Sequence, residues 1–452
     1  MDGTARIAVF GAGYAGLVTG VCFAELGHSV VVRDIDAAKI EALQAGRVPF
    51  FEPRLEELIE GTRERVTFTL DAAEAVEGAE FMFVCVGTPA TYAGDADLSA
   101  VWTVLDELTG VGDGVVLVMK STVPVGTGEK VRAGLDARGL EHVGYVSNPE
   151  FLAEGTAVRD FLEPDRIVIG SWDDADGDRV EALQADLDAP VVRTDVASAE
   201  MIKLSANAFL GARISFINEI ANVCELVGAD VEEVARGMGL DKRIGTRYLR
   251  AGIGFGGSCF PKDISFLKLL AGNSGYHFQL LNAVIEVNEL QKRRLVSKLQ
   301  KHLGSLRGKS VALLGLAFKP NTDDLREAPS IVLASRLLAE GADVRAWDPV
   351  ADASGVLSGI TVSDSVLDAV RDADAAVIVT DWDELRDIAR TEVREAMRNP
   401  LIVDGRNLLD PEVATKAGFV YEGIGRPTSP FGGLPETEEP HLPSEELQGP
   451  AS

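Results

Sequence analysis

Two blocks of the chain alternate short β-branched runs with helical patterns, and this alternation limits the fold more than any other feature. In the first block the runs lie at residues 6–10, 29–32, 81–86, 115–120, 144–147 and 166–169. The second block begins with SVALLGLAF at Ser310 and continues through DVRAWD, AAVIVTD and LIVDG. Such alternation predicts parallel sheets with helices on both faces. We therefore expect an α/β protein with two doubly wound domains.

A helical region separates the two blocks. From about Ser198, apolar residues recur at helical spacing for roughly thirty residues, as in Ile202, Phe209, Ile217 and Cys224. This pattern predicts a long central helix and a small helical domain between the sheets. The expected divisions are residues 1–197, 198–300 and 301–428. Residues 429–452 are rich in Pro, Glu and Gly and poor in apolar residues, so we expect a disordered tail.

The charge balance excludes one class of partner. The 452 residues include 43 Lys and Arg against 71 Asp and Glu, a net charge of -28. A nucleic acid binds through Lys and Arg that neutralise its phosphates, so a nucleic-acid partner is not expected. A small anionic ligand remains compatible with this charge, because a few local cations and helix N-termini are enough to hold it.

An uncharged run at residues 7–24 has the length of a signal peptide or a short membrane span. It contains four glycines in nucleotide-loop spacing, and Glu25 and His28 follow it directly. We therefore expect no membrane segment. The four cysteines are scattered, with no C-x-x-C pair and no cluster of histidines. This usage favours a reducing, cytoplasmic location and gives no metal site.

The first strand runs into a glycine-rich turn, Gly11-Ala12-Gly13-Tyr14-Ala15-Gly16, that opens a helical pattern. Gly11, Gly13 and Gly16 allow a tight turn, close approach of a pyrophosphate, and packing of the helix on the strand. Asp34 ends the second strand, where a carboxylate binds the adenosine ribose of NAD. Glycine clusters also form plain turns, but the strand, the helix and Asp34 together favour NAD. Arg33 suits NADP, although neighbouring strand side chains point to opposite faces.

Two further loops follow apolar strands, CVGTP at residues 85–89 and STVPVG at residues 121–126. Ligands of open α/β sheets bind at this edge, so both loops are candidates for the cofactor site. Ordinary turns with Gly and Pro are the equal alternative.

The strongest local signal is GFGGSCFPKD at residues 254–263, followed by the helical pattern ISFLKLLAG. Pro261 suits the first turn of a helix. Backbone amides at a helix N-terminus and a nearby lysine favour a thiolate, so Cys259 is a candidate nucleophile. The other cysteines, Cys22, Cys85 and Cys224, lie in apolar runs and are expected to be buried packing residues.

Lys203 and Asn207 are four residues apart on the central helix and share one face. From their spacing alone they form either a solvated stripe or one wall of a polar site. Because lysine is seldom buried without a partner, the solvated stripe is the first reading of the pattern.

Long segments of this sequence resemble the UDP-glucose/GDP-mannose dehydrogenase family. The similarity extends from about Arg6 to Arg406 and includes GAGYAGLVTGVCFAELGH, STVPVGT, NPEFLAEGTAVRDFLEPDRIVIG, IKLSANAFLGARISFINEIANVCE, RIGTRYLRAGIGFGGSCFPKD and FKPNTDDLREAPS. The resemblance implies two Rossmann-like domains around the central helix. Departures are few: Ala15, Arg33 and Ser205 replace residues common in the family.

The resemblance also implies roles for particular residues. It makes Cys259 the nucleophile, places Lys203, Asn207 and Asp263 at the reacting centre, gives Glu150 as an acid or base, and lets Thr122 position water. The implied cofactor contacts are Gly11, Gly13, Gly16, Asp34, Lys39, Thr88, Thr122, Glu154 and Arg326. The implied substrate contacts are Phe151, Leu152, Glu154, Lys203, Asn207, Arg243, Arg250, Phe255, Gly256, Lys319 and Arg406. Exposed solvated charges are the alternative for Lys319, Arg326 and Arg406.

The implied reaction is a four-electron oxidation of the UDP-glucose C6 alcohol to UDP-glucuronate, with NAD, through a thiohemiacetal and a thioester on Cys259. GDP-mannose or another nucleotide sugar is the alternative substrate. A one-step hydroxyacid dehydrogenase and a non-catalytic NAD-binding module are more distant alternatives. GLAFK, in the C-terminal block, lacks the full glycine pattern, so that domain is expected to hold the nucleotide of the substrate. The family resemblance further implies a homodimer through the central helix, with Arg243 reaching the partner's site.

Overall fold

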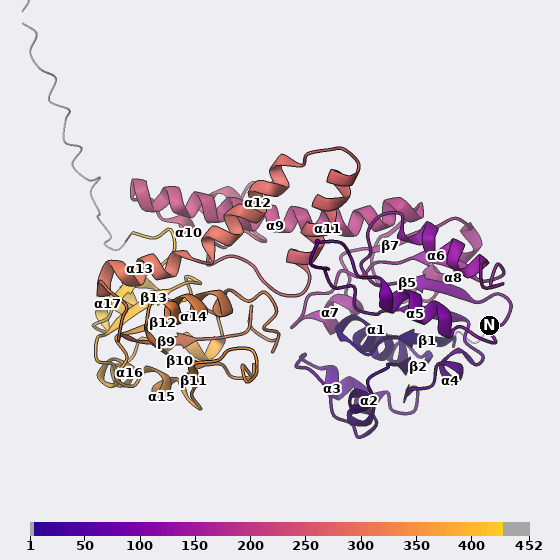
Figure 1. Ribbon diagram of the computed structural model, residues 1–452, viewed down its shortest axis with the longest axis horizontal. Coiled ribbons are helices and arrows are strands. Elements are labelled where there is room, and N and C mark those ends of the chain that lie inside the picture. The colour runs from indigo at the N-terminus through magenta and orange to yellow at the C-terminus, as the bar shows by residue number, and fades with distance from the viewer. Residues whose placement is uncertain (1–3, 428–452) are drawn as a thin grey trace, which may run out of the picture.

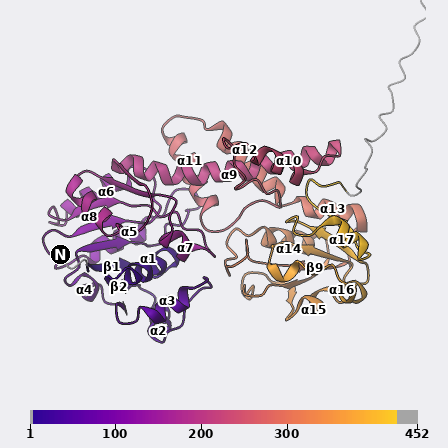
Figure 2. The same cartoon turned by 180° about the vertical axis from the view of Figure 1, so that it is seen from behind.

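The computed structural model describes residues 4–427, which form two α/β lobes bridged by long helices (Figure 1). The N-terminal lobe and the C-terminal lobe lie at opposite ends of the molecule, and the same arrangement is visible from behind (Figure 2). The expectation of a disordered tail at 429–452 concerns residues outside the described range. No helix within residues 4–427 combines the length and the apolar character needed to cross a membrane.

The first lobe contains an eight-stranded sheet built mainly from apolar, β-branched runs. In spatial order its strands are β3 (Val66–Thr69), β2 (Ser29–Arg33), β1 (Arg6–Phe10), β4 (Phe81–Val84), β5 (Val116–Met119), β6 (Gly144–Ser147), β7 (Ile167–Ser171) and β8 (Val191–Thr194). Every pair is parallel except β6 and β7, which run antiparallel. The expected all-parallel sheet is therefore corrected at this pair, and β3 and β8 are edge strands that the apolar runs did not reveal.

Helices cover both faces of this sheet. They are α1 (Tyr14–Glu25), α2 (Ala37–Gln44), α3 (Leu55–Gly61), α4 (Ala72–Val76), α5 (Ser99–Glu107), α6 (Thr127–Asp136), α7 (Ala157–Leu162) and α8 (Asp174–Ala182). The side chains of β1 alternate between two separate apolar clusters, with Ile7 and Val9 in one and Ala8 and Phe10 in the other. Both faces of the strand are thus buried, as expected for a doubly wound sheet.

The middle of the chain is helical. Its elements are α9 (Val196–Val227), α10 (Val231–Gly239), α11 (Phe260–Asn273), α12 (Gln279–Gln291) and α13 (Arg294–Leu303). Asp195 caps the start of α9 by accepting a bond from the Ser198 amide, and Gly228 ends it in the left-handed conformation at φ 76°. The 32 residues of α9 match the predicted central helix and run from the first lobe to the second (Figure 1).

The second lobe contains a six-stranded parallel sheet. In spatial order its strands are β11 (Ile360–Val362), β10 (Asp343–Trp347), β9 (Ser310–Leu314), β12 (Ala375–Ile378), β13 (Leu401–Asp404) and β14 (Val420–Glu422). The surrounding helices are α14 (Pro329–Ala339), α15 (Val366–Val370), the 3₁₀ turn η1 (Asp383–Leu385), α16 (Thr391–Ala396) and α17 (Pro411–Lys416). The predicted fold of two α/β lobes joined by helices is confirmed.

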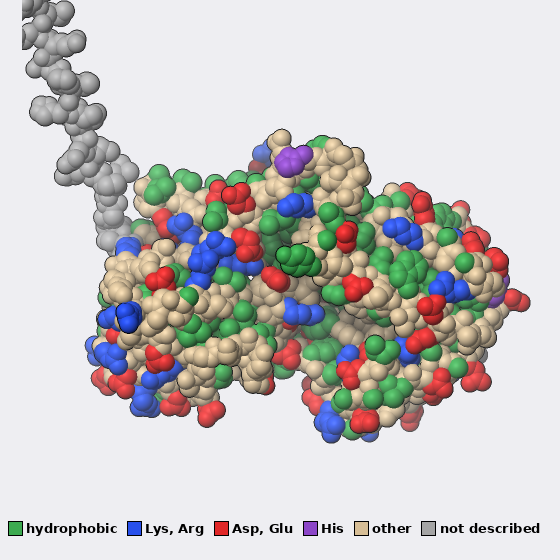
Figure 3. All heavy atoms as spheres, viewed as in Figure 1, with side chains coloured by type: hydrophobic (Ala, Val, Ile, Leu, Met, Phe, Trp, Pro, Cys, Tyr) green, Lys and Arg blue, Asp and Glu red, His purple; other side chains and the backbone are tan. Residues whose placement is uncertain are grey.

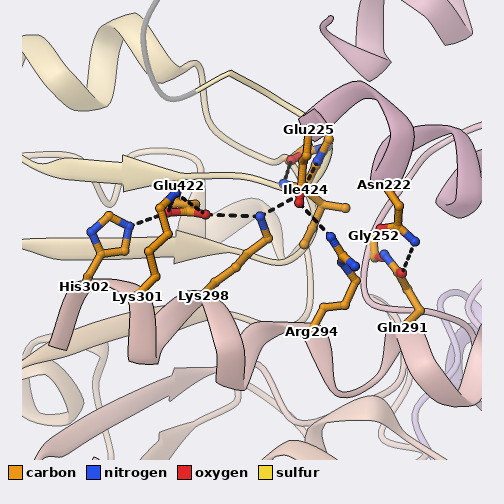
Figure 4. Close-up of polar contacts among 12 residues, drawn as sticks. Asn222, Glu225, Gly252, Gln291, Arg294, Lys298, Lys301, His302, Glu422 and Ile424 are labelled. Atoms are coloured by element: carbon orange, nitrogen blue, oxygen red, sulfur yellow. Dashed lines mark hydrogen bonds and ion pairs between the residues drawn. The ribbon is translucent and has the colours of Figure 1, made fainter. Parts of the chain in front are cut away.

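A charged network ties the second lobe to the central helices (Figure 4). Lys298 of α13 lies between two carboxylates, 2.7 Å from Glu225 of α9 and 3.2 Å from Glu422 of β14. Lys301 adds a contact of 3.0 Å to Glu422, and His302 binds the same carboxylate. Strand β14 is thereby linked through Lys298 to α9, in addition to its pairing in the sheet.

Candidate active site

The glycine turn after β1 has the shape that a bound dinucleotide requires. Gly11 has φ 103°, and a side chain there would lie 2.6 Å from the Cys85 carbonyl oxygen. A side chain at Gly16 would lie 1.9 Å from the Gly11 carbonyl oxygen, so this glycine allows α1 to pack against the turn. At Gly13, the N-cap of α1, a side chain would meet nothing within 4 Å. The open space at a helix N-terminus is where a pyrophosphate fits.

Asp34 follows β2 and faces this turn. Its Oδ2 accepts the Ala12 amide at 2.6 Å and lies 3.3 Å from Lys39 Nζ. Burial raises the pKa of Asp34, but bonds from the Asp36 and Ala12 amides and the charge of Lys39 outweigh it, so the net pKa is lowered. The carboxylate is therefore ionised and suited to accept ribose hydroxyls.

Arg33 does not share this position. Its guanidinium lies 2.6 Å from Glu107 on α5, and its side chain is buried. The Arg33 charge is thus paired with Glu107 and is not available to the 2′-phosphate of NADP. This agrees with the prediction that neighbouring strand side chains point to opposite faces.

The loops after β4 and β5 are bonded to each other at the same sheet edge. Thr88 Oγ1 donates to the Thr122 carbonyl oxygen at 2.7 Å, and Ser121 Oγ donates to the Val86 carbonyl oxygen at 2.7 Å. Both threonines are buried. The two loops therefore form one rigid wall beside the glycine turn.

Cys259 lies at the N-cap of α11, with Pro261 in the first turn as the sequence predicted. The preceding glycines are packed against the second lobe. A side chain at Gly256 would lie 2.3 Å from the Glu327 carbonyl oxygen, and one at Gly257 would lie 2.7 Å from the Phe318 ring. The cysteine loop is therefore pressed between the lobes, and Figure 3 shows the surface indented between them.

Two buried polar pairs lie beside this cysteine. Lys203 Nζ on α9 is 3.0 Å from Glu150 Oε1, and Asn207 Nδ2 donates to Asp263 Oδ2 at 2.6 Å. Lys203 is 3% exposed and Asp263 0%, so the solvated-stripe alternative for this face of α9 is wrong. Lys262 also contacts Asp263 at 2.5 Å. Helices α9 and α11 thus bring the predicted polar residues to one place.

The ionisation of these groups follows from their pairing. Burial and the Glu150 charge raise the pKa of the Cys259 thiol, while Lys203 opposes them. The thiolate expected from the motif is therefore not favoured in this structure, because burial and the charges of Glu150 and Asp263 outweigh the charge of Lys203. Burial alone would raise the pKa of Glu150 and lower that of Lys203, but their mutual attraction reverses both shifts. Glu150 is thus an ionised carboxylate in this structure.

Glu154 connects the first lobe with the second. Its Oε1 accepts Ser258 Oγ at 2.9 Å and lies 3.4 Å from Arg326, and its Oε2 accepts Thr322 Oγ1 at 3.2 Å. Burial, together with the charge of Asp324, raises the pKa of Glu154 to about 7. This carboxylate can therefore exchange a proton near neutral pH at the boundary of the lobes.

Cations of the central part and of the second lobe also reach this boundary. Arg406 donates to the carbonyl oxygens of Val379 at 2.7 Å and Phe318 at 2.9 Å, and Arg250 lies 2.7 Å from Asp381. Burial lowers the pKa of Lys319, although Glu154 and Cys259 oppose that shift. These interactions preorganise Arg406 and Arg250 beside the cysteine loop. Among Lys319, Arg326 and Arg406, Arg326 fits the alternative of an exposed, solvated charge best, because its side chain is 65% exposed.

An aromatic side chain, Phe151, lies beside the Lys203–Glu150 pair. The Arg166 guanidinium lies 3.5 Å from the centre of the Phe151 ring, and Lys203 Nζ lies 5.4 Å from it. Leu152 donates its amide to Glu150 at 2.6 Å, which fixes the loop that carries both residues. Phe255 is buried, and its amide donates to Asn288 at 2.8 Å.

One predicted substrate residue lies apart from the others. The Arg243 side chain is 88% exposed and contacts Asp241 at 2.6 Å. The residues that sequence reasoning missed include Ser258 and Glu52. Ser258 directly precedes Cys259 in its motif, which was the available signal. Glu52 accepts the amides of Gly155 and Ala157 at 2.6 and 2.7 Å, and nothing in its sequence context indicated this.

Comparison with known proteins agrees with this geometry. Residues 5–188 match the NAD binding domain of the UDP-glucose/GDP-mannose dehydrogenase family, residues 197–290 its central domain, and residues 312–411 its UDP binding domain. The match to the NAD binding domain confirms NAD as the expected cofactor.

Individual relatives are similar over nearly the whole chain. The chain is 46% identical to UDP-glucose 6-dehydrogenase TuaD of Bacillus subtilis, over 98% of both chains. It is 46% identical to the UDP-glucose 6-dehydrogenase of Pseudomonas aeruginosa, over 93% of this chain and 98% of the relative. The solved UDP-glucose dehydrogenase of Pyrobaculum islandicum superposes with a TM-score of 0.85 at 38% identity, over 94% of this chain and 98% of the other. This chain belongs to the UDP-glucose/GDP-mannose dehydrogenase family.

Proposed function

We propose that this protein is an NAD-dependent oxidoreductase that converts the C6 alcohol of UDP-glucose to the carboxylate of UDP-glucuronate, with Cys259 as the nucleophile. The observation that carries the proposal is the thiol at the start of α11 beside the buried pairs Lys203–Glu150 and Asn207–Asp263. Relatives named UDP-glucose 6-dehydrogenase at 46% identity support the choice of sugar.

The cysteine answers a chemical difficulty of the second oxidation. When bound, NAD would supply the hydride acceptor for the first oxidation, and a second NAD molecule would supply it for the second. The first step leaves an aldehyde, which has no alkoxide from which a second hydride can leave. Addition of the Cys259 sulfur to the aldehyde carbon forms a thiohemiacetal, and its oxidation gives a thioester on the same sulfur. Water then cleaves the carbon–sulfur bond, releases the acid and restores the thiol.

The polar pairs supply the proton transfers and the charge stabilisation. Glu150 is an ionised carboxylate that accepts the C6 hydroxyl proton in the first oxidation, passes that proton to water, and then accepts the thiol proton. Lys203 and Asn207 donate hydrogen bonds to the oxyanions that develop at C6, and each such donor contributes about 10²-fold to the rate. Asp263 accepts from Asn207 and so fixes the direction of its amide. Thr122 positions the hydrolytic water.

The binding roles divide between the lobes. Gly11, Gly13 and Gly16 admit the pyrophosphate of NAD, Asp34 and Lys39 hold its ribose, and Thr88 lies beside them. Residues 1–197 supply this cofactor site and residues 198–300 the nucleophile. In residues 301–428, Lys319 and Arg406 are placed against the sugar diphosphate, because guanidinium and ammonium groups match phosphate oxygens.

A homodimer through α9 completes the proposal. Phe209, Phe216 and Val223 lie at seven-residue spacing on α9, and their exposed fractions are 64%, 49% and 52%. Beside them α9, α11 and α12 form an apolar groove of about 570 Å³. A contiguous apolar face of this kind marks a protein interface. The exposed Arg243 is then free to reach the partner's site. We place the enzyme in the cytoplasm, because its four cysteines are free thiols.

The first test is the amount of NADH formed per sugar. With limiting sugar, absorbance at 340 nm should report about two NADH per UDP-glucose, as a four-electron oxidation requires, and little NADH from GDP-mannose. One NADH per sugar would instead indicate a simple alcohol dehydrogenase. A reversed preference would assign the site to GDP-mannose.

The Cys259→Ser variant tests the nucleophile. It should still bind UDP-glucose but produce no sustained UDP-glucuronate, because a serine ester or a free aldehyde does not complete the cycle at a useful rate. Cys224→Ser, a buried thiol on α9, is the matched control and should turn over normally. Undiminished acid production by Cys259→Ser would overturn the mechanism.

A further inference from the structure

A buried carboxylate on α9 has no part in the chemistry proposed so far. Glu200 is 2% exposed and precedes Lys203 on the same helix. Its Oε2 accepts the Gly126 amide at 2.7 Å, and its Oε1 accepts the Gly128 amide at 2.7 Å. Removing a carboxylate from water is costly unless its oxygens find donors. These two amides are the donors that it has.

The amides belong to the start of α6, which lacks a cap of its own. The N-cap position of α6 is Gly126 in the left-handed conformation, and no side chain of the first turn caps the helix. The first amides of a helix have no acceptor within that helix. A neighbouring Ser, Thr, Asp or Asn usually supplies one. Here the acceptor comes instead from α9.

This bond joins the two walls of the candidate site. The loop that ends at Gly126 carries Thr122, whose carbonyl oxygen binds Thr88 in the cofactor wall. The helix that carries Glu200 also carries Lys203 and Asn207, one and two turns further along. A side chain at Gly128 would lie 2.5 Å from Val196, so the two helices pack closely at this point.

We propose that Glu200 is a positioning residue for the oxidation: its carboxylate clamps the loop that carries Thr122 against the helix that carries Lys203. This inference rests on the proposed function. Both oxidations need the groups at C6 and the cofactor wall in one geometry, although the carbon changes from alcohol to aldehyde to thioester between them. Because Glu200 binds both the Gly126 and the Gly128 amide, it restrains the loop against translation and against rotation relative to α9.

The protonation state of the clamp matters near neutral pH. Burial raises the pKa of Glu200 to about 7, while the Gly128 and Gly126 amides oppose the shift. Glu129 raises the pKa further, Lys130 lowers it, and Tyr145 lies within reach of the Glu200 charge. The ionised form accepts from both amides, whereas the protonated form has one good acceptor oxygen. The clamp is therefore tightest above pH 7.

Two variants separate the geometry of the clamp from its charge. Glu200→Gln keeps the length but replaces one acceptor with a donor, and Glu200→Asp keeps the charge but is one methylene too short to reach both amides. Glu129→Gln is the matched control, because Glu129 is an exposed carboxylate in the first turn of the same helix.

We expect both Glu200 variants to lose kcat by about tenfold or more with KM for UDP-glucose nearly unchanged, because small misplacements of reacting groups cost rate rather than binding. Amide hydrogen exchange over residues 121–131 should accelerate in both, while exchange in the C-terminal half of α9 stays as in the parent protein. Glu129→Gln should match the parent in both measurements at about pH 9, where Glu200 is ionised in either protein. Lowering the pH through 7 should reduce kcat of the parent protein more than that of Glu200→Gln, which already lacks the second acceptor.

Each contrary result has a definite meaning. Normal kcat in both Glu200 variants would overturn the inference. If amide exchange were faster at the same time, Glu200 would cap the start of α6 without positioning the reacting groups. Normal kcat in Glu200→Asp alone would show that only the charge matters at this helix start. Absence of NADH from the parent protein would overturn the proposed function itself, and the exchange data would still report the clamp.

Discussion

The environment of Cys259 is assembled from side chains that lie far apart in the sequence. Its motif, its place before Pro261 and the helix that follows could all be predicted from GFGGSCFPKD. Its protonation could not, because the charges of Glu150 and Lys203 reach the sulfur only after folding. The sequence supplied the nucleophile and its nearest helix, and tertiary structure supplied the groups that control it.

The glycines of the cofactor turn were likewise predictable from the sequence only in part. The pattern Gly11, Gly13, Gly16 was readable from spacing, but the spacing does not say which glycine the fold needs and which the ligand needs. In the structure, side chains at Gly11 and Gly16 would strike backbone oxygens, whereas Gly13 faces open space. Gly13 is therefore the position at which ligand binding and folding can be separated.

We expect Gly13→Ala to fold with a melting temperature close to that of the parent but to bind NAD about tenfold more weakly or worse, because the methyl group occupies the approach of the pyrophosphate. Calorimetric titration with NAD and a thermal melt of the ligand-free protein measure the two quantities. Gly16→Ala is the matched comparison and should lose stability even without NAD, since its methyl group would lie 1.9 Å from the Gly11 carbonyl oxygen. A Gly13→Ala protein with normal NAD affinity would remove this turn from the cofactor site.

At the scale of elements, long buried strands were predictable and edge strands were not. β4 and β5 are apolar throughout, and β1 and β9 are apolar after their first residue, so composition alone located them. β8 and β11 expose much of their length at the sheet edges and carry a mixed pattern. The antiparallel pairing of β6 and β7 was not predictable, because the direction of a strand depends on the path of its connection rather than on its composition.

Helix α13 shows how an element is held by charge as well as by apolar packing. Glu422 is 4% exposed and faces Lys298, Lys301 and His302 (Figure 4). Burial raises the pKa of Glu422, but the cations and their hydrogen bonds lower it by more. The folded protein therefore favours the ionised form. This contribution to stability is present above the ordinary pKa of 4.5 and is lost as the pH falls through the folded value.

We expect Glu422→Ala to destabilise the second lobe by about 2 kcal/mol at pH 7, because it removes the buried carboxylate that accepts from Lys298, Lys301 and His302. The deficit relative to the parent should shrink as the pH falls below 4.5, where the parent loses the same interaction. Urea unfolding followed by circular dichroism at pH 7 and pH 4 measures both effects. Glu412→Ala, which breaks an exposed pair with Lys416 in α17, is the control and should cost less than about 0.5 kcal/mol. An equal deficit at both pH values would contradict the electrostatic account.

At the scale of the whole molecule, the three segments matched by the family correspond to cofactor, central and nucleotide-binding parts, and the site lies where they meet. The order of these parts along the chain was predictable from the repeated alternation of strand and helix. Their contact was not, since it depends on bonds such as Ser258 to Glu154 and Thr322 to Glu154. These bonds connect residues that no local pattern relates.

The exposed apolar face of α9 leads to a prediction about assembly. Phe216→Asp should convert the proposed dimer to a monomer, because a charge in the middle of an apolar interface must be desolvated without a partner. Light scattering after size-exclusion chromatography gives the mass directly. Val413→Asp, at an exposed apolar position on α17, is the control and should leave the mass unchanged. A parent protein that elutes with the mass of one chain would refute the dimer.

Helix α9 also sets the distance between two groups of contacts. At 1.5 Å per residue its 32 residues span about 48 Å, with Asn207 bonded to Asp263 on α11 and Glu225 bonded to Arg294 on α13 and to the Gly425 amide. Inserting one residue between them would rotate Glu225 by about 100° and carry it away from Arg294 and Lys298, because a helix turns by that angle at each step. The number of residues in this helix therefore aligns the candidate site with the contacts of the second lobe.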